Sequence, residues 1–470
     1  MSQMSIPEML KPGAISSDSE ERIDTDILEP VIFTESFIRY ELQNKGLLNP
    51  QSRITFSLNG HGDHDSFYPL GVGVGSVIDR ATLKIGGKTI CEIQDFNFYQ
   101  AYKSMFIDQS VIKEREQFNS GRCMSNAVVY NKDNVVSEKV SIDNGKEFVM
   151  NATDTNSELR THTFQRLPKQ PVFSITLDDL FPAIRGIQLP LFMLRSDQAV
   201  QLELTLSNSV GERASLSSGG DNSTHSFTLD QTECRMIADY TFLDGEEMNE
   251  FARANSDFSF MFLEPRLTKT TLADQAAAQN QVRNVGGAGR LVSKMFVGVS
   301  SDKMSVHFSA SATGDQKTLL NKYRGVACEL TGTRAGGDLS YGKLVSNVKK
   351  NDEFLYPLDR QNSALHFHGV ADTEGAPPHI TRAEYARGGN SLVARKFEGY
   401  PMNGANELTG QFFYNAYRMN DGERVDSRGL ELHHKYQDLA AAEAPYTSRC
   451  WIEVQKVMRM KDGVVDCYYA

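Results

Sequence analysis

One short segment concentrates residue types that bind metal ions. The sequence NGHGDHDS at 59–66 contains His61, Asp63, His64 and Asp65. Imidazole and carboxylate groups are ligands of divalent cations, but this spacing matches neither a zinc finger nor an EF-hand loop. We therefore expect a polar surface loop without a functional metal.

A second candidate is a histidine pair in the last third of the chain. His366 and His368 lie two positions apart, so a strand would place both imidazoles on one face. A cupin metal site combines such a pair with a carboxylate and a further histidine on neighbouring strands, for which Asp372 and His379 are candidates. The glycine pattern of that class is absent. A cupin-like or carbohydrate-active jelly-roll enzyme is therefore the alternative to a protein without catalysis.

Other catalytic and cofactor motifs are incomplete. GVGVG at 71–75 precedes a predicted strand, whereas a nucleotide-binding loop opens a helix. We interpret it as a flexible turn or a close contact between chains. GGAGR at 286–290 lacks the Lys-Ser/Thr of a phosphate-binding loop, and the chain has no Gly-x-Ser-x-Gly elbow. We predict no catalytic residue, no cofactor and no metal.

The composition is that of a folded chain with room for two domains. Of its 470 residues, 40% are hydrophobic and 23% charged, and a single core stops growing at roughly 250–300 residues. The net charge of −11 argues against direct nucleic-acid binding, which needs clustered lysine and arginine.

Cysteine usage and the N-terminus indicate a protein made in the cytosol. No CxxC pair occurs, which predicts free, mostly buried thiols in a reducing compartment. The N-terminus lacks the basic start and apolar core of a signal peptide, and no apolar run approaches the ~20 residues that span a bilayer. The cysteines are Cys91, Cys123, Cys234, Cys328, Cys450 and Cys467.

The candidate site residues named above must be positioned by strands, because apolar and polar residues alternate with a period of two along most of the chain. The clearest case is 200–206, and Gly86–Gly87 is a two-residue hairpin signal. The chain closes with a predicted hairpin of Cys450–Met460 and Val464–Tyr469. Further candidate strands are 37–42, 53–58, 81–85, 89–93, 258–263, 291–299, 305–310, 326–330, 365–370 and 411–419. Many short strands with regular turns predict paired antiparallel sandwiches, but periodicity does not distinguish a jelly roll from another Greek key.

Helical patterns are few and short. Phe96, Tyr99 and Phe106 recur at helical spacing, which predicts a helix between Asp95 and Asp108 packed against a barrel. The Ala- and Gln-rich segment 272–282 is predicted to form a short loop helix. Polar residues dominate 111–160, which we interpret as a long excursion with short strands near Val128 and Phe148.

The middle of the chain changes its hydrophobic period twice. A strand-like pattern at 236–242 is followed by a predicted helix, for which Asp244 is the N-cap and Glu247 occupies the capping-box position. Strand-like residues resume at Phe258. This pattern predicts two β-rich halves joined by a short, ordered connector at 244–257.

The connector also carries a family resemblance. Tyr240, Phe242, Leu243 and Asp244, followed by Phe251 and Ala252, resemble the junction between the barrels of double jelly-roll major capsid proteins of eukaryotic double-stranded DNA viruses. Within that lineage of nucleocytoplasmic large DNA viruses, the length is most similar to polinton-like virus and virophage members. A second match is FPAIRGIQLPLFMLRSDQAVQLELTLSN (Phe181–Asn208), which is similar to the Leu-Pro-aromatic turn and following strand of the first barrel.

The resemblance implies an all-β fold of two consecutive eight-stranded antiparallel jelly rolls with short loop helices. Residues 1–30 would be an N-terminal arm and 31–243 the first jelly roll, with the insertion at 111–160 forming an outward tower. The connector helix would occupy 244–257 and the second jelly roll 258–470.

The function implied by the resemblance is that of a major capsid protein. Homotrimers would form pseudo-hexagonal capsomers, with the helix at 96–106 among the trimer contacts, and would tile an icosahedral virion. Expected partners are neighbouring capsomers, minor capsid and penton proteins, and an inner membrane reached by the N-terminal arm. A minor capsid or penton protein is a further alternative, although such proteins usually have one barrel.

Overall fold

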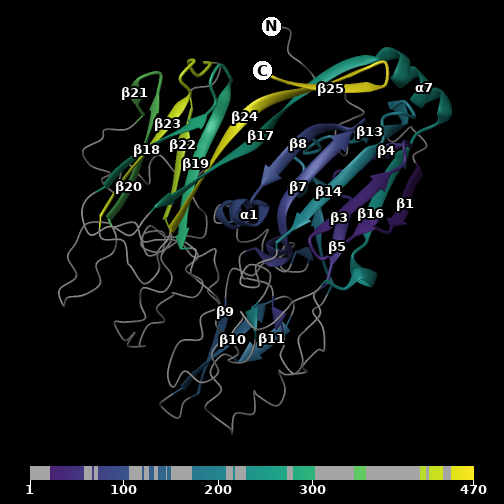
Figure 1. Ribbon diagram of the computed structural model, residues 1–470. Helices are drawn as coiled ribbons and strands as arrows, with labels where there is room; N and C mark the ends of the chain where they lie inside the picture. Colours follow the sequence, from purple (N-terminus) through teal and green to yellow (C-terminus); the bar gives the residue numbers. More distant parts are fainter. Residues whose placement is uncertain are drawn as a thin grey trace.

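Strands dominate the structure and form two barrels that lie side by side (Figure 1). None of the helices in the described residues is long and apolar enough to cross a membrane. The computed structural model describes residues 22–57, 66–67, 72–104, 119–120, 126–131, 136–143, 146–149, 172–207, 215–216, 229–272, 279–301, 343–355, 413–419, 423–437 and 446–470.

The first barrel consists of two antiparallel sheets. One has the order β12-β5-β16-β4-β13, with β1 paired to β16, and the other has the order β2-β3-β14-β7-β8. The strands of the first sheet are β1 (Arg22–Leu28), β4 (Leu47–Leu48), β5 (Arg53–Phe56), β12 (Phe173–Thr176), β13 (Leu189–Pro190) and β16 (Met236–Phe242). Those of the second sheet are β2 (Ile32–Phe33), β3 (Phe37–Leu42), β7 (Ile78–Ile85), β8 (Lys88–Gln94) and β14 (Val200–Leu206).

The second barrel also has two sheets. Their orders are β17-β24-β19-β22, with β25 paired to β24, and β18-β23-β20-β21. The strands of the first of these sheets are β17 (Asp257–Leu272), β19 (Val292–Ser301), β22 (Phe413–Arg418), β24 (Tyr446–Lys461) and β25 (Val464–Tyr469). Those of the second are β18 (Gln279–Gly286), β20 (Lys343–Lys350), β21 (Glu353–Phe354) and β23 (Leu430–Gln437).

The two halves share one strand order. In the described part of the chain, eight principal strands can be numbered in chain order along each half. In the first half they are β1, β3, β4 with β5, β7, β8, β12, β14 and β16, and in the second half they are β17 to β24. In both halves one sheet then reads 1-8-3-6 and the other 2-7-4-5. This order, with distant strands paired, is that of an eight-stranded jelly roll. The predicted fold of two consecutive jelly rolls is confirmed.

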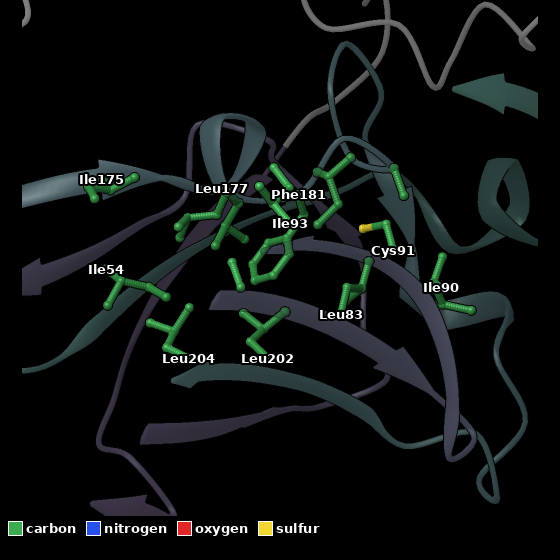
Figure 2. Close-up of a cluster of buried hydrophobic side chains, with 14 of the residues drawn as sticks. Ile54, Leu83, Ile90, Cys91, Ile93, Ile175, Leu177, Phe181, Leu202 and Leu204 are labelled. Atoms are coloured by element: carbon green, nitrogen blue, oxygen red, sulfur yellow. The ribbon is translucent and has the colours of Figure 1, made fainter. Parts of the chain in front are cut away.

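Hydrophobic alternation builds the core of the first barrel. Val200, Leu202 and Leu204 of β14 point inward and are fully buried. Figure 2 shows side chains of both sheets, including Ile54, Leu83 and Leu202, lying together with Phe181 and Cys91. The predicted Gly86–Gly87 turn joins β7 to β8, and both glycines have positive φ.

The structure corrects the boundary of the N-terminal arm. Residues 22–28 form β1 and pair with β16 from Arg22↔Phe242 to Leu28↔Met236. Lys45 forms an ion pair with Asp26 of this strand at 2.6 Å. The first jelly roll therefore begins at residue 22, and residues 1–21 lie outside the described residues.

Three local predictions are also corrected. Residues 279–282 belong to strand β18 rather than to a loop helix, and 273–278 lie outside the described residues. Gly73–Val77 forms a buried 3₁₀ turn instead of a flexible or intermolecular one. The predicted final hairpin has its turn at 461–463, but Lys461 belongs to β24 and the turn consists of Asp462–Gly463.

The insertion at 111–160 contains the expected strands. They are β9 (Asn126–Asn131), β10 (Val136–Asp143) and β11 (Lys146–Val149), which form an antiparallel sheet apart from both barrels (Figure 1). The remaining short strands, β6 (Ser66–Phe67) and β15 (Ser215–Leu216), pair with each other. The candidate strands at 305–310, 326–330 and 365–370 lie outside the described residues.

A buried histidine lies in the second barrel. His434 of β23 is fully buried, and its Nε2 lies 2.8 Å from Ser448 Oγ on β24. Burial, together with the neighbouring His433, lowers the pKa of His434 from its usual 6.5 to about 4. The folded chain therefore holds this imidazole neutral, whereas the unfolded chain binds a proton near pH 6.5.

This histidine should make the second barrel sensitive to acid. Because the folded pKa is depressed, its contribution is fully present above pH 6.5 and is lost as the pH falls toward 4, by about 3 kcal/mol in total. Urea unfolding of the wild type and of His434→Gln, at pH 7 and at pH 4.5, measures this difference. The stability of His434→Gln should depend less on pH. If the free energy of unfolding fell by the same amount between pH 7 and pH 4.5 in both proteins, the assignment would be contradicted.

Candidate functional site: the interface between the barrels

The candidate metal ligands are not brought together in the described structure. His61, Asp63, His64 and Asp65 lie outside the described residues. The same holds for His366, His368, Asp372 and His379. Within the described ranges, no group of His, Cys, Asp or Glu side chains has the arrangement of a metal site.

The described cysteines are structural. Cys91, Cys234 and Cys450 are buried free thiols, and Cys467 is half-buried and free. Burial raises the pKa of Cys91 and Cys234 to about 12 and that of Cys467 to about 11. Thiols with such pKa values stay protonated and are poor nucleophiles. The prediction of free, mostly buried thiols is confirmed for these four.

The most specific side-chain arrangement lies between the barrels. Helix α1 (Phe96–Ser104) belongs to the connection between β8 and β12 of the first barrel. It packs on the outer face of the second barrel's sheet, between the two barrels in Figure 1. Because one chain supplies both sides, this contact fixes the orientation of one jelly roll relative to the other.

An aromatic cluster forms the centre of this interface. Trp451 of β24 stacks on Phe296 of β19, with ring centroids 5.4 Å apart. From α1, Tyr102 meets the same indole edge-on at 5.4 Å and Tyr99 at 6.0 Å. All four side chains are buried. Aromatic pairs in these geometries add about 0.5–1.5 kcal/mol each beyond the burial of their surface.

Strand β19 is buried on both faces. Met295, Val297 and Val299 point into the second barrel, while Phe296 and Gly298 point toward α1. A Cβ atom on Gly298 would lie 2.1 Å from Cε2 of Tyr102. Glycine is therefore required at this position by the close approach of a ring rather than by backbone conformation.

Gly298→Ala should destabilise the protein by forcing Tyr102 out of its place. Overpacking of this kind costs about 1–3 kcal/mol. A double-mutant cycle with Tyr102→Ala, followed by denaturant unfolding, tests the cause. Once the ring is removed, the added methyl group should cost little. Additive effects of the two substitutions would contradict the proposed clash.

Charged side chains surround the aromatic cluster, and most of them form ion pairs between the two barrels. Asp95, at the start of α1, accepts from Arg449 Nε at 2.8 Å and pairs with Lys269 Nζ at 2.6 Å. The Arg449 guanidinium also lies 3.6 Å from the centre of the Phe98 ring. Asp95 and Arg449 are buried, so removal of one would strand the other in a low-dielectric site.

A second acid extends this network. Glu453 of β24 pairs with Lys103 of α1 at 3.4 Å and with Lys294 of β19 at 3.7 Å. The Tyr99 hydroxyl donates to the same carboxylate at 3.4 Å. Next to it, Trp451 Nε1 donates to the Gln94 carbonyl at 3.2 Å. These directional contacts permit one docked orientation of α1.

A second contact covers the edge of the first barrel. β8 is the last strand of its sheet and lies against β17 and β25. The alternating face of β17, with Phe258, Phe260 and Phe262, joins the core of the first barrel. The second barrel thus protects an edge that would otherwise be open to pairing with another chain.

A buried ion pair lies at the end of this apolar row. Lys456 Nζ is 2.9 Å from Glu264 Oε1, and the Tyr469 hydroxyl donates to Glu264 Oε2 at 2.9 Å. Both charged groups are almost completely buried. Tyr469 belongs to β25, so the C-terminal hairpin completes the site.

The predicted connector forms helix α7 (Gly245–Ala254). Asp244 is its N-cap, as predicted, and its Oδ1 accepts from the Gly245 amide at 2.6 Å. In a capping box, the Asp244 side chain would instead accept a hydrogen bond from the backbone amide of Glu247. Glu247, the residue at the predicted capping-box position, lies half-buried in the first turn of α7.

The connector residues anchor this helix to the first barrel. Tyr240, Leu243 and Phe251 are buried, whereas Phe242 and Ala252 are half-buried. The Phe251 ring lies 6.3 Å from Phe192, which belongs to the second segment that carried the resemblance. The two motifs recognised in the sequence therefore meet in the structure.

The role expected for the aromatic helix needs correction. Phe96, Tyr99 and Tyr102 are buried within one chain, so they are not available for trimer contacts; Phe106 lies outside the described residues. The sequence identified this helix but not its partner strands. The sequence MFVGV at 295–299 contains a signal for these partners. It is apolar at both odd and even positions, which is typical of a strand that is covered on both faces.

No protein-family model and no curated protein matches the sequence. Solved structures do. A cryo-EM structure of the Sputnik virophage matches with a TM-score of 0.58 and 10% identity, covering 97% of this chain and 90% of that chain. A model of the PBCV-1 virus capsid matches with a TM-score of 0.53 and 11% identity, covering 97% and 98%. At such low identities the likeness concerns the fold: the chain has the double jelly-roll architecture found in these virus structures.

Proposed function

We propose that this chain is a major capsid protein whose homotrimers form pseudo-hexagonal capsomers that tile an icosahedral shell. The observation that carries the proposal is the repeated strand order of two barrels held together by a buried, directional interface. Three such chains supply six similar barrels, which suits a block with six neighbours. The fold shared with virus capsid structures supports the same function.

In this proposal the chain acts by its shape. The segment before β1 would lie at the capsomer base and meet minor capsid proteins or an inner membrane. The insertion with β9–β11 would form the outward tower facing the host. Penton proteins would fill the vertices of the shell, and the protein would reside in the virion after synthesis in the host cytosol.

The mass of the purified protein tests this function. Light scattering should give three times the chain mass of 52.4 kDa. A stable monomer would contradict the capsomer assignment, and a pentamer would favour a penton protein.

Metal analysis of the same sample addresses the enzyme alternative. A cupin-like enzyme should retain a transition metal, and His366→Ala should abolish that binding, whereas His64→Ala serves as the control at the other histidine segment. Stoichiometric metal lost only in His366→Ala would favour the enzyme.

A further inference from the structure

The two barrels differ in how equivalent sheet faces are covered. In the second barrel, the outer face of β17-β24-β19-β22 is covered by α1. The equivalent sheet of the first barrel is β1-β16-β5-β12. Its outer face exposes Ile23 by 67% and Ile27 by 63%. This face lies on the side of the first barrel away from the second (Figure 1).

We propose that this outer face, centred on β1, is covered by the second barrel of a neighbouring copy of the chain. The inference rests on the proposed trimer and names its contact surface. Each chain carries one covered face and one open face of the same topology. If the contact between the two barrels of one chain is repeated between chains, the second barrel of one copy meets the first barrel of the next in a head-to-tail arrangement. Such contacts form a closed ring when the rotation from one copy to the next adds up to a full turn.

The chemistry of the open face fits a contact made after folding. Ile23 and Ile27 lie on one face of β1, and Ile27 lies opposite the half-buried Ile237 of β16. Between them, Thr25 donates to Asp239 at 2.7 Å. This mixture of apolar and polar groups resembles a subunit interface more than the aromatic cluster inside the chain does.

The position of β1 supports the same occupant. In the described part of the chain, β1 pairs only with β16 and forms an edge of its sheet. Large apolar residues are rarely left on such an edge, because they invite pairing with other chains. A neighbouring copy would cover them, just as β17 covers the edge strand β8.

The double variant Ile23→Asp/Ile27→Asp tests the surface by light scattering. Both side chains are exposed, so the barrel should fold, which circular dichroism checks. We expect the variant trimer to be weaker, so that it dissociates to monomers at a protein concentration at least tenfold higher than the wild-type trimer does. Val282→Asp is the matched control, because Val282 is 46% exposed on β18, in a sheet that the proposal leaves open. It should remain trimeric.

A labelling experiment tests the surface without disrupting it. Ile27→Cys should react with maleimide at least tenfold more slowly in the trimer than after dilution to monomers, while Val282→Cys should react equally in both states. Labelling of the wild type gives the background from native thiols. If Ile23→Asp/Ile27→Asp remained trimeric and Ile27→Cys reacted with maleimide equally fast in the trimer and in the monomer, the assignment of this surface would be overturned, whereas the proposed trimer would stand. A monomeric wild type would instead overturn the proposed function and this inference with it.

Discussion

Trp451→Ala should lower the free energy of unfolding by about 3–5 kcal/mol, the range for removing a large aromatic side chain from a packed site. The indole is fully buried and contacts Phe296, Tyr99 and Tyr102 from two barrels. Its loss leaves a cavity at the centre of the interface and frees the Gln94 carbonyl from its donor. We therefore expect the barrels to lose their fixed orientation as well as stability.

Denaturant unfolding measures the loss of stability, and proteolysis of the native protein measures the loosening between barrels. Tyr468→Ala is the control, because Tyr468 is an exposed aromatic residue in the same sheet. It should change stability by less than about 0.5 kcal/mol. A Trp451→Ala protein as stable as this control would contradict the role of the aromatic cluster.

The second large effect is expected from Lys456→Met. This substitution leaves the Glu264 carboxylate buried without its cation, which costs about 3–5 kcal/mol when a buried pair is broken. The Tyr469 hydroxyl still donates to that carboxylate but carries no charge. The destabilisation should therefore exceed the loss of an ordinary hydrogen bond.

Replacement of both partners separates the stranded charge from the loss of the pair. Glu264→Met/Lys456→Met should be more stable than Lys456→Met alone, because no charge remains buried. Arg459→Met is the control on the same strand, where the partner Asp257 is exposed and screened by solvent, and should cost far less than Lys456→Met. Equal effects of Lys456→Met and Arg459→Met would contradict the account.

Local sequence patterns predicted the strands but not all of their partners. The alternation of 200–206 and the Gly86–Gly87 turn depend on neighbours in the chain, and both are confirmed. Strand β1 pairs with β16, a strand about halfway along the chain. No local rule reveals that Lys45 neutralises Asp26 or that β16 lies alongside. The jelly-roll order came from the family resemblance, and the structure confirms it.

The inter-barrel site was predicted in part. The aromatic spacing of Phe96 and Tyr99 identified the helix, and Asp244 identified the connector. Trp451 and Glu453 lie about 350 residues from their partners on α1, and sequence periodicity carries no information on such distant contacts. The connector motif marks the junction in the sequence, whereas the aromatic and ionic contacts across the interface come from α1 and from strands of the second barrel.

Single-particle electron microscopy of the purified protein tests the central claim most directly, namely that one chain is a rigid pair of jelly rolls built to form a six-barrel block. The account predicts particles with three-fold symmetry, a hexagonal outline and six barrel-shaped densities, in which both barrels of each chain keep one orientation. Single chains whose two barrels lie at variable distances and angles would contradict it.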